Sequence, residues 1–165
     1  MSKGLVTIGR FILPWLSSGI FGMLLALAGL SASCANAGGV QGAGVEWETL
    51  TRETEELYRA GEYDRAVVVA KKALEVAEKS VGTDHPDVAT SLNNLAELYT
   101  TRGQYAQAEP LYKRSLAIME KALGPDHPNV ATGLENLAAI YRATKRDEEA
   151  ETLEQRVARI RAIQR

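Results

Sequence analysis

The chain has 165 residues, of which 45% are apolar and 24% are charged, and its formal net charge is −2. This composition fits one ordinary globular domain with additional segments. After residue 37 the chain carries 17 basic and 21 acidic side chains, which argues against nucleic acid as the main partner, because nucleic-acid binding requires a concentrated basic face. Because Cys34 is the only cysteine, no disulfide can form within the chain, and packing alone must hold the fold.

Residues 1–37 have the layout of a secretory leader. Lys3 and Arg10 precede the apolar run 20–30, which ends in the small-residue stretch SASCANA, and the segment contains no acid. A basic start, a short apolar middle and a small-residue exit are typical of a signal peptide. The sequence therefore predicts export, to the periplasm or out of the cell. The alternative is an uncleaved membrane anchor, since the apolar stretch extends back to Phe11.

Two exit points are compatible with this leader. Ala35-Asn36-Ala37 is an A-x-A cleavage site that would release a chain beginning at Gly38. Cys34 resembles the lipidated cysteine of bacterial lipoproteins, although that family usually has leucine three residues earlier and this sequence has Ser31. Membrane contact is expected only through the leader or through a lipid on Cys34. Residues 38–45, rich in glycine and without charge, are predicted to be a flexible linker to a domain at 46–165.

The domain contains an internal repeat of forty-two residues. Residues 82–99 and 124–141 are identical at twelve of eighteen positions. Within the middle unit, apolar residues recur at helical spacing over 92–99 and 108–119, with Gly103 between them. The sequence predicts an all-α solenoid of three helix-turn-helix repeats at residues 47–80, 89–122 and 131–164.

Turns and helix starts follow the same repeat. Gly61 and Gly103 supply the positive φ that a tight turn between helices requires. The connectors contain the sequence Asp-His-Pro, in which the proline suits the first position of the next helix. Asp84 and Asp126 are predicted to cap those helices.

These residues resemble the tetratricopeptide repeats (TPR), in the 42-residue form of kinesin light chains and many bacterial proteins. The middle unit matches the pattern of that family at nine positions, which are Leu92, Leu95, Ala96, Tyr99, Gly103, Tyr105, Ala108, Tyr112 and Leu116. The connector LGPDHPNVA is close to the kinesin-light-chain type, and the resemblance covers residues 47–164. It implies an α-α superhelix in which the first helix of each repeat lines a concave groove.

The outer repeats depart from this pattern. The first has Thr54 and Leu57 in place of alanine and tyrosine, and the third departs at Lys145, Asp147 and Glu154, which predicts a looser turn there. End units of a solenoid need a polar outer face, and helix 147–163, with its narrow apolar stripe, is predicted to be such a cap. Three repeats suffice for a stable array, so we expect a monomer.

The sequence contains no catalytic or cofactor motif that we recognise. His85 and His127 lie beside aspartates, which suggests metal binding or acid–base chemistry, but they occupy the same connector position of successive repeats, so the repeat explains both. Neither a phosphate-binding loop nor a nucleophile elbow is present. We therefore expect a protein that is not an enzyme and that holds no metal or cofactor.

The expected function is binding of a protein or peptide in the concave groove. Carried over by position, the polar candidates are Asn94, Asn136, Arg52, Arg59, Glu97 and Arg142. The resemblance implies that asparagine at the place of Asn94 and Asn136 bonds the backbone of a bound peptide, and an amide offers both donor and acceptor. The alternative is a structural subunit that docks on a larger complex through its convex face, with no ligand in the groove.

Overall fold

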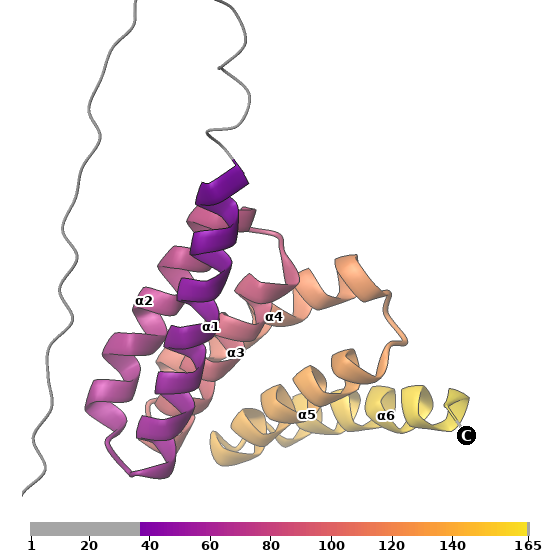
Figure 1. Cartoon of the computed structure of the whole chain (residues 1–165). Helices are drawn as coiled ribbons and strands as arrows, with labels where there is room; N and C mark the ends of the chain where they lie inside the picture. The colour runs from indigo at the N-terminus through magenta and orange to yellow at the C-terminus, as the bar shows by residue number, and fades with distance from the viewer. Residues whose placement is uncertain (1–36, 165) are drawn as a thin grey trace, which may run out of the picture. The chain divides into compact units, whose positions relative to one another are not determined.

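The computed structural model describes residues 37–164, and within this range the chain is helical apart from short turns and connectors (Figure 1). The six helices are α1 (Ala37–Arg59), α2 (Tyr63–Val81), α3 (Pro86–Thr101), α4 (Tyr105–Leu123), α5 (Pro128–Ala143) and α6 (Asp147–Ile163). They pair as α1–α2, α3–α4 and α5–α6, and each pair packs on the next (Figure 1). The predicted all-α solenoid of three helix-turn-helix repeats is confirmed.

Two sequence predictions concern the start of the chain. Cys34 and the predicted leader up to residue 36 lie outside the described residues. Residues 38–45, predicted to be a flexible linker, instead form the first turns of α1. Glycine is permissive rather than forbidden in a helix, and each further residue adds a hydrogen bond to a helix that already exists. These turns bury little, since Gly42, Gly44 and Val45 are exposed. None of the helices in the described range is long and apolar enough to cross a membrane.

The buried apolar residues form four clusters. Three of them join buried residues of at least three helices, and in the fourth the buried residues of α5 and α6 pack against the half-buried Leu116 and Met119 of α4. The first cluster, for example, places Leu57 of α1 and Val67 of α2 against Leu98 of α3. Leu111 of α4 packs against three of the four clusters. No pair of helices therefore has a closed core of its own, and each repeat depends on its neighbours for burial.

The three turns inside the repeats share one backbone conformation. Gly61, Gly103 and Lys145 have φ angles of 76°, 70° and 62°. In each turn the amide of the following residue donates to the carbonyl five positions upstream, at 2.8–2.9 Å, which is the Schellman pattern of a helix end. The prediction of a looser turn in the third repeat is wrong. The same bonds form, and Lys145 adopts a left-handed conformation that costs little only for glycine.

The residue after Lys145 holds this strained turn in place. The Arg146 guanidinium lies 4.0 Å from the centre of the Tyr141 ring and 2.8 Å from a carboxylate oxygen of Glu109 on α4. Hydrogen bonds from Lys113 and then from Arg146 lower the pKa of Glu109 from its ordinary value, so the carboxylate stays charged at neutral pH. The turn of the third repeat is thus fastened to the second.

An arginine on the second helix of a repeat marks each junction between repeats. Arg114 of α4 lies 2.6 Å from Glu78 of α2, and Arg156 of α6 lies 2.5 Å from Glu120 of α4. Both arginines also donate to a carbonyl of the preceding connector. The two sets of contacts are forty-two residues apart. Partly exposed pairs of this kind contribute roughly 0–1 kcal/mol each, and their repetition indicates that they fix the register of stacking rather than supply most of the stability.

The outer face of α1, which we call the N-terminal end face, carries glutamates where the inner repeats carry aliphatic residues. In α3 and α5 the equivalent positions are buried against the preceding repeat and are occupied by Val88, Leu95 and Leu98 and by Val130, Leu137 and Ile140. In α1 they are Glu46, Glu53 and Glu56, all exposed. The carboxylates would lose their hydration in a stacked contact, so this face does not accept another repeat.

The outer face of α6 is polar in a similar way. Glu154 and Arg161 stand where α2 and α4 have alanine, tyrosine or methionine. Arg142 of α5 lies 2.8 Å from Glu154, and Arg161 lies 2.5 Å from Glu135 of α5. Helix α6 thus has the polar outer face that the sequence predicts for an end unit.

We predict that Lys145→Gly stabilises the protein by about 0.5–1 kcal/mol, because the relief of left-handed strain exceeds the added entropy of the unfolded chain. The reverse exchange, Gly103→Lys, should destabilise it by at least as much. A Cβ on Gly103 would meet no atom within 4 Å, so the effect would come from the backbone alone. Urea unfolding of both variants checks this, and a stability loss in Lys145→Gly would contradict it.

We predict that the triple substitution Glu46→Val, Glu53→Leu and Glu56→Leu makes the chain self-associate, because it recreates the apolar face that α3 and α5 bury. Sedimentation velocity over a range of concentrations measures the effect. The control replaces the same number of exposed glutamates elsewhere, at Glu48, Glu62 and Glu75. Equal association of the two variants would show that added apolarity, rather than this face, is responsible.

Candidate binding groove

The first helices of the repeats, α1, α3 and α5, form one face of the array, which we call the groove. A pocket of about 320 Å³ lies between α1 and α3. Helix α1 contributes Thr54, Glu55, Tyr58 and Arg59 to this α1–α3 pocket, and α3 contributes Asn94, Glu97 and Leu98. Helical spacing of three and four residues brings the contributing side chains of each helix to one side.

The polar groups of the α1–α3 pocket are not all satisfied within the chain. Arg59 lies 3.0 Å from Glu55, one turn away on the same helix. The hydroxyl of Thr54 donates to the Leu50 carbonyl at 2.8 Å. Asn94 and Glu97, in contrast, make no side-chain hydrogen bond or ion pair among residues 37–164. An amide and a carboxylate are therefore available to a ligand.

Tyr112 of α4 is buried, and its phenol interacts with Glu97 of the α1–α3 pocket. Burial raises the pKa of Tyr112 to about 12, against a hydrogen bond with Thr100 that lowers it, and the charge of Glu97 acts in the raising direction. The phenol is consequently neutral at any physiological pH.

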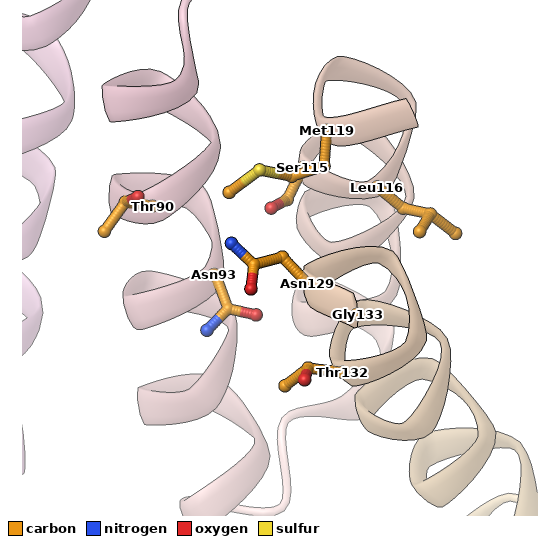
Figure 2. A pocket seen from close by; sticks show the side chains of 8 residues that line it. All are labelled: Thr90, Asn93, Ser115, Leu116, Met119, Asn129, Thr132 and Gly133. Atoms are coloured by element: carbon orange, nitrogen blue, oxygen red, sulfur yellow. The ribbon is translucent and has the colours of Figure 1, made fainter. Parts of the chain in front are cut away.

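The second pocket, of about 180 Å³, lies between α3 and α5 over α4 (Figure 2). Figure 2 shows Thr90 and Asn93 of α3 on one side and Asn129, Thr132 and Gly133 of α5 on the other. Helix α4 provides Ser115, Leu116 and Met119. No charged residue lines this α3–α5 pocket, which combines two apolar side chains with hydroxyls and amides.

One repeat earlier, the equivalent place is filled by the chain itself. Trp47 of α1 packs against the cluster that contains Ala89, and its indole Nε1 donates to the Ser91 hydroxyl at 2.7 Å. Forty-two residues later, Ala89 stands in the place of Trp47, and Gly133 stands in the place of Ser91. Smaller residues thus leave open at the second junction a space that tryptophan fills at the first, although Met119 narrows it.

The structure brings three of the six predicted site residues together. Arg59, Asn94 and Glu97 line the α1–α3 pocket. Arg52 is exposed on α1 and lines neither the α1–α3 pocket nor the α3–α5 pocket. Asn136 donates through its amide nitrogen to the side-chain oxygen of Asn93 on α3, at 3.1 Å.

The remaining candidate, Arg142, forms ion pairs with α6 and lines neither groove pocket. It lies 2.8 Å from Glu154 and 3.1 Å from Asp147, both on α6. Its predicted role in peptide binding is therefore not supported by its position. The equivalent residues in the first two repeats are Tyr58 and Thr100. Only in the last repeat does the second helix, α6, place two carboxylates next to this position.

The sequence predictions did not include the α3–α5 pocket or the aromatic wall formed by Tyr58. The signal for the pocket is present when the repeats are aligned. A large residue, Trp47, and its hydrogen-bond partner are replaced together by alanine and glycine in the next unit. Such a paired loss of volume between neighbouring repeats indicates a cavity, unless a third residue grows to fill it.

The two histidines have a structural role. The Nδ1 atom of His85 accepts from the Asp87 amide at 3.2 Å, and that of His127 accepts from the Asn129 amide at 3.1 Å. The prediction that Asp84 and Asp126 cap these helices is thus wrong, because the histidines are the capping residues. Between residues 37 and 164 there is no group of three or more His, Cys, Asp or Glu side chains placed to hold a metal ion.

Solved structures with the same fold include TPR-like repeats of a kinesin light chain from Podosopora anserina, with a TM-score of 0.64 and 26% identity over 70% of this chain and 55% of that one. BtubC (BKLC) of P. vanneervenii matches with a TM-score of 0.67 and 23% identity, over 70% of this chain and 46% of that one. The TPR domain of Arabidopsis FLU matches with a TM-score of 0.63 and 19% identity, over 73% and 98%. The chain thus matches about half the length of the first two.

Sequence comparison leads to the same family. No curated protein has significant similarity to the chain. The tetratricopeptide repeat family model matches residues 57–121 and 98–162, which together extend over more than half of the chain. This protein belongs to the tetratricopeptide repeat family, in its kinesin-light-chain-like form, whose non-catalytic repeats mediate protein–protein interactions.

Proposed function

We propose that this protein is a non-enzymatic interaction module that binds a protein or peptide segment in the groove of α1, α3 and α5, in the bacterial cell envelope. The observation that carries the proposal is the α1–α3 pocket, in which Asn94 faces a space of about 320 Å³ and has no side-chain partner among the described residues. A half-buried amide offers one acceptor and two donors, which is what an extended backbone needs.

The two groove asparagines take different roles in this proposal. Asn94 binds the ligand backbone, as asparagine does at this position in related proteins. Asn136 instead positions α5 against α3 through its bond to Asn93. The predicted pair of equivalent contacts thus becomes one ligand contact and one internal strut.

The cell envelope is proposed from the leader. Its basic start, apolar run and small-residue exit support export, either as a periplasmic or secreted protein or as a lipoprotein anchored at Cys34. The glutamates on the outer face of α1 and the ion pairs of Glu154 and Arg161 on α6 support a monomer, because stacking would remove water from these charges.

A second candidate function is docking through the second helices of the repeats, α2, α4 and α6, with the groove empty. Val68 favours it, since this residue of α2 is 68% exposed. A single exposed valine is ordinary on a protein surface, so the groove is the better-supported site. The two candidates place the partner on opposite helices of each repeat.

The position of the partner can be measured by photo-crosslinking. A benzophenone amino acid at Asn94 samples the groove, and the same amino acid at Val68 samples the second helices. In cells that express the protein, we expect partner adducts from position 94 and none from position 68. Adducts from position 68 alone would replace the groove proposal with the second candidate.

We predict that Asn94→Ala weakens binding of the crosslinked partner severalfold and leaves the melting temperature unchanged, because it removes one neutral hydrogen bond of about 0.5–1.5 kcal/mol. Asn136→Ala is the matched control. It should lower the free energy of unfolding by about the same amount, because Asn93 loses its internal donor. Titration calorimetry and thermal unfolding of both variants provide the measurements. If Asn94→Ala destabilised the fold without affecting affinity, the amide would be structural.

A further inference from the structure

We infer that the groove selects a segment with a lysine or arginine side chain at the α1–α3 pocket and an uncharged side chain at the α3–α5 pocket. This inference rests on the proposed function and adds the chemistry of the partner to it. It follows from the charged groups and the apolar and aromatic surfaces of the two pockets.

The α1–α3 pocket has a net negative charge. Of its three charged residues, Arg59 and Glu55 form an ion pair at 3.0 Å, and both are well exposed. Glu97 has no cation within ion-pair distance among the described residues. An acidic ligand side chain would be repelled by the Glu97 carboxylate. An apolar ligand side chain would remove water from this carboxylate without replacing the lost hydrogen bonds. A basic side chain compensates the charge.

The walls of the α1–α3 pocket suit a long basic side chain. Leu98 is 1% exposed and forms apolar floor, and Tyr58 provides an aromatic wall. The methylene stem of lysine or arginine covers apolar surface while its charged end stays near water. Here that end would reach Glu97 and could also approach the ring of Tyr58, a favourable contact for a cation.

An unpaired glutamate beside an aromatic wall, as at Glu97 and Tyr58, occurs at only one place along the groove of the described residues. One repeat later, the place of Glu97 is taken by Ala139 and that of Tyr58 by Thr100. In the third repeat the place of Tyr58 is taken by Arg142, which is already paired with α6. A basic side chain therefore has one preferred position in the groove, at the junction of the first two repeats.

The α3–α5 pocket prefers an uncharged side chain. Leu116 and Met119 give it apolar surface, and its polar groups are hydroxyls and amides, which provide no countercharge. Asn93 borders this pocket, and the adjacent Asn94 borders the other one. Because both pockets flank α3, one segment that crosses this helix can occupy both, with its basic and uncharged residues a few positions apart.

The test uses a library of random octapeptides in which one position is fixed as lysine, arginine, norleucine or glutamate. Binding to the protein is measured by fluorescence anisotropy at low salt. We expect the lysine and arginine sets to bind about two- to fivefold more tightly than the norleucine set, and the glutamate set to bind least. The preference should decrease with added salt, since the contact is partly exposed.

Two variants test the roles of the two pockets. Glu97→Gln should abolish the preference for a basic residue, whereas the control Glu148→Gln, which removes the same charge at the start of α6, should retain it. Gly133→Leu fills the α3–α5 pocket, where an added Cβ would already lie 3.3 Å from a terminal methyl group of Leu116. It should weaken all peptides equally and leave the preference for a basic residue intact.

The outcomes separate the two proposals. A basic preference that Glu97→Gln leaves unchanged, or a preference for glutamate, would overturn the inference about the partner. If such peptides still lost affinity through Asn94→Ala, binding in the groove would stand. Absence of any peptide binding that depends on Asn94 or Glu97 would overturn both.

Discussion

The structure depends on one constraint, which is that no pair of helices in this chain can bury its apolar side without a neighbour. Leu111 makes this concrete, since a single side chain of α4 packs against three of the four apolar clusters. Full burial of a leucine stabilises by roughly 1.5–3 kcal/mol, and the half-buried Leu111 gains part of this through contacts with helices of all three repeats. The core is therefore continuous along the array although it is assembled from small units.

This constraint explains why equivalent positions on α1, α3 and α5 hold different types of residue. Where a repeat packs on a preceding one, these positions hold valine, leucine or isoleucine, and at the face of α1 they hold glutamate. The same logic applies inside the groove. Trp47 fills one space at the junction of the first two repeats, while alanine and glycine leave the equivalent space open at the next junction. End faces and binding pockets both arise as departures from the repeat, at positions where its packing role is given up.

Most of the fold could be predicted from the sequence because the same local signals for helices and turns occur in more than one repeat. Helix starts at Pro86 and Pro128 and turns at Gly61 and Gly103 follow from local rules that recur every forty-two residues. The polar face of α6 follows from its departure from the repeat, which is expected of an end unit. The predictions that were wrong depend on competition between local alternatives. Aspartate and histidine are neighbours in the connectors, and only backbone geometry decides which one caps the helix. Residues 38–45 have a linker composition, but they continue a helix that stronger residues nucleate.

The binding site was less predictable, because a polar residue on a helix face reveals its position but not its partner. Asn94 and Asn136 are equivalent in sequence, yet Asn93 engages only one of them. In the third repeat the residue equivalent to Asn93 is Glu135, which pairs with Arg161. Whether a side chain is free thus depends on neighbours in other repeats, and these long-range pairings differ from one junction to the next even when the local sequence repeats.

The hydrogen bond between Trp47 and Ser91 has a spectroscopic consequence. The sequence contains two tryptophans, and the other, Trp15, belongs to the predicted leader. In the chain that begins after the leader, all indole fluorescence would come from one half-buried ring that bridges α1 and α3. Its emission would then report the separation of the first repeat from the second, while circular dichroism reports all six helices. The protein thus carries an intrinsic optical probe of whether its array comes apart at one end or melts as a whole.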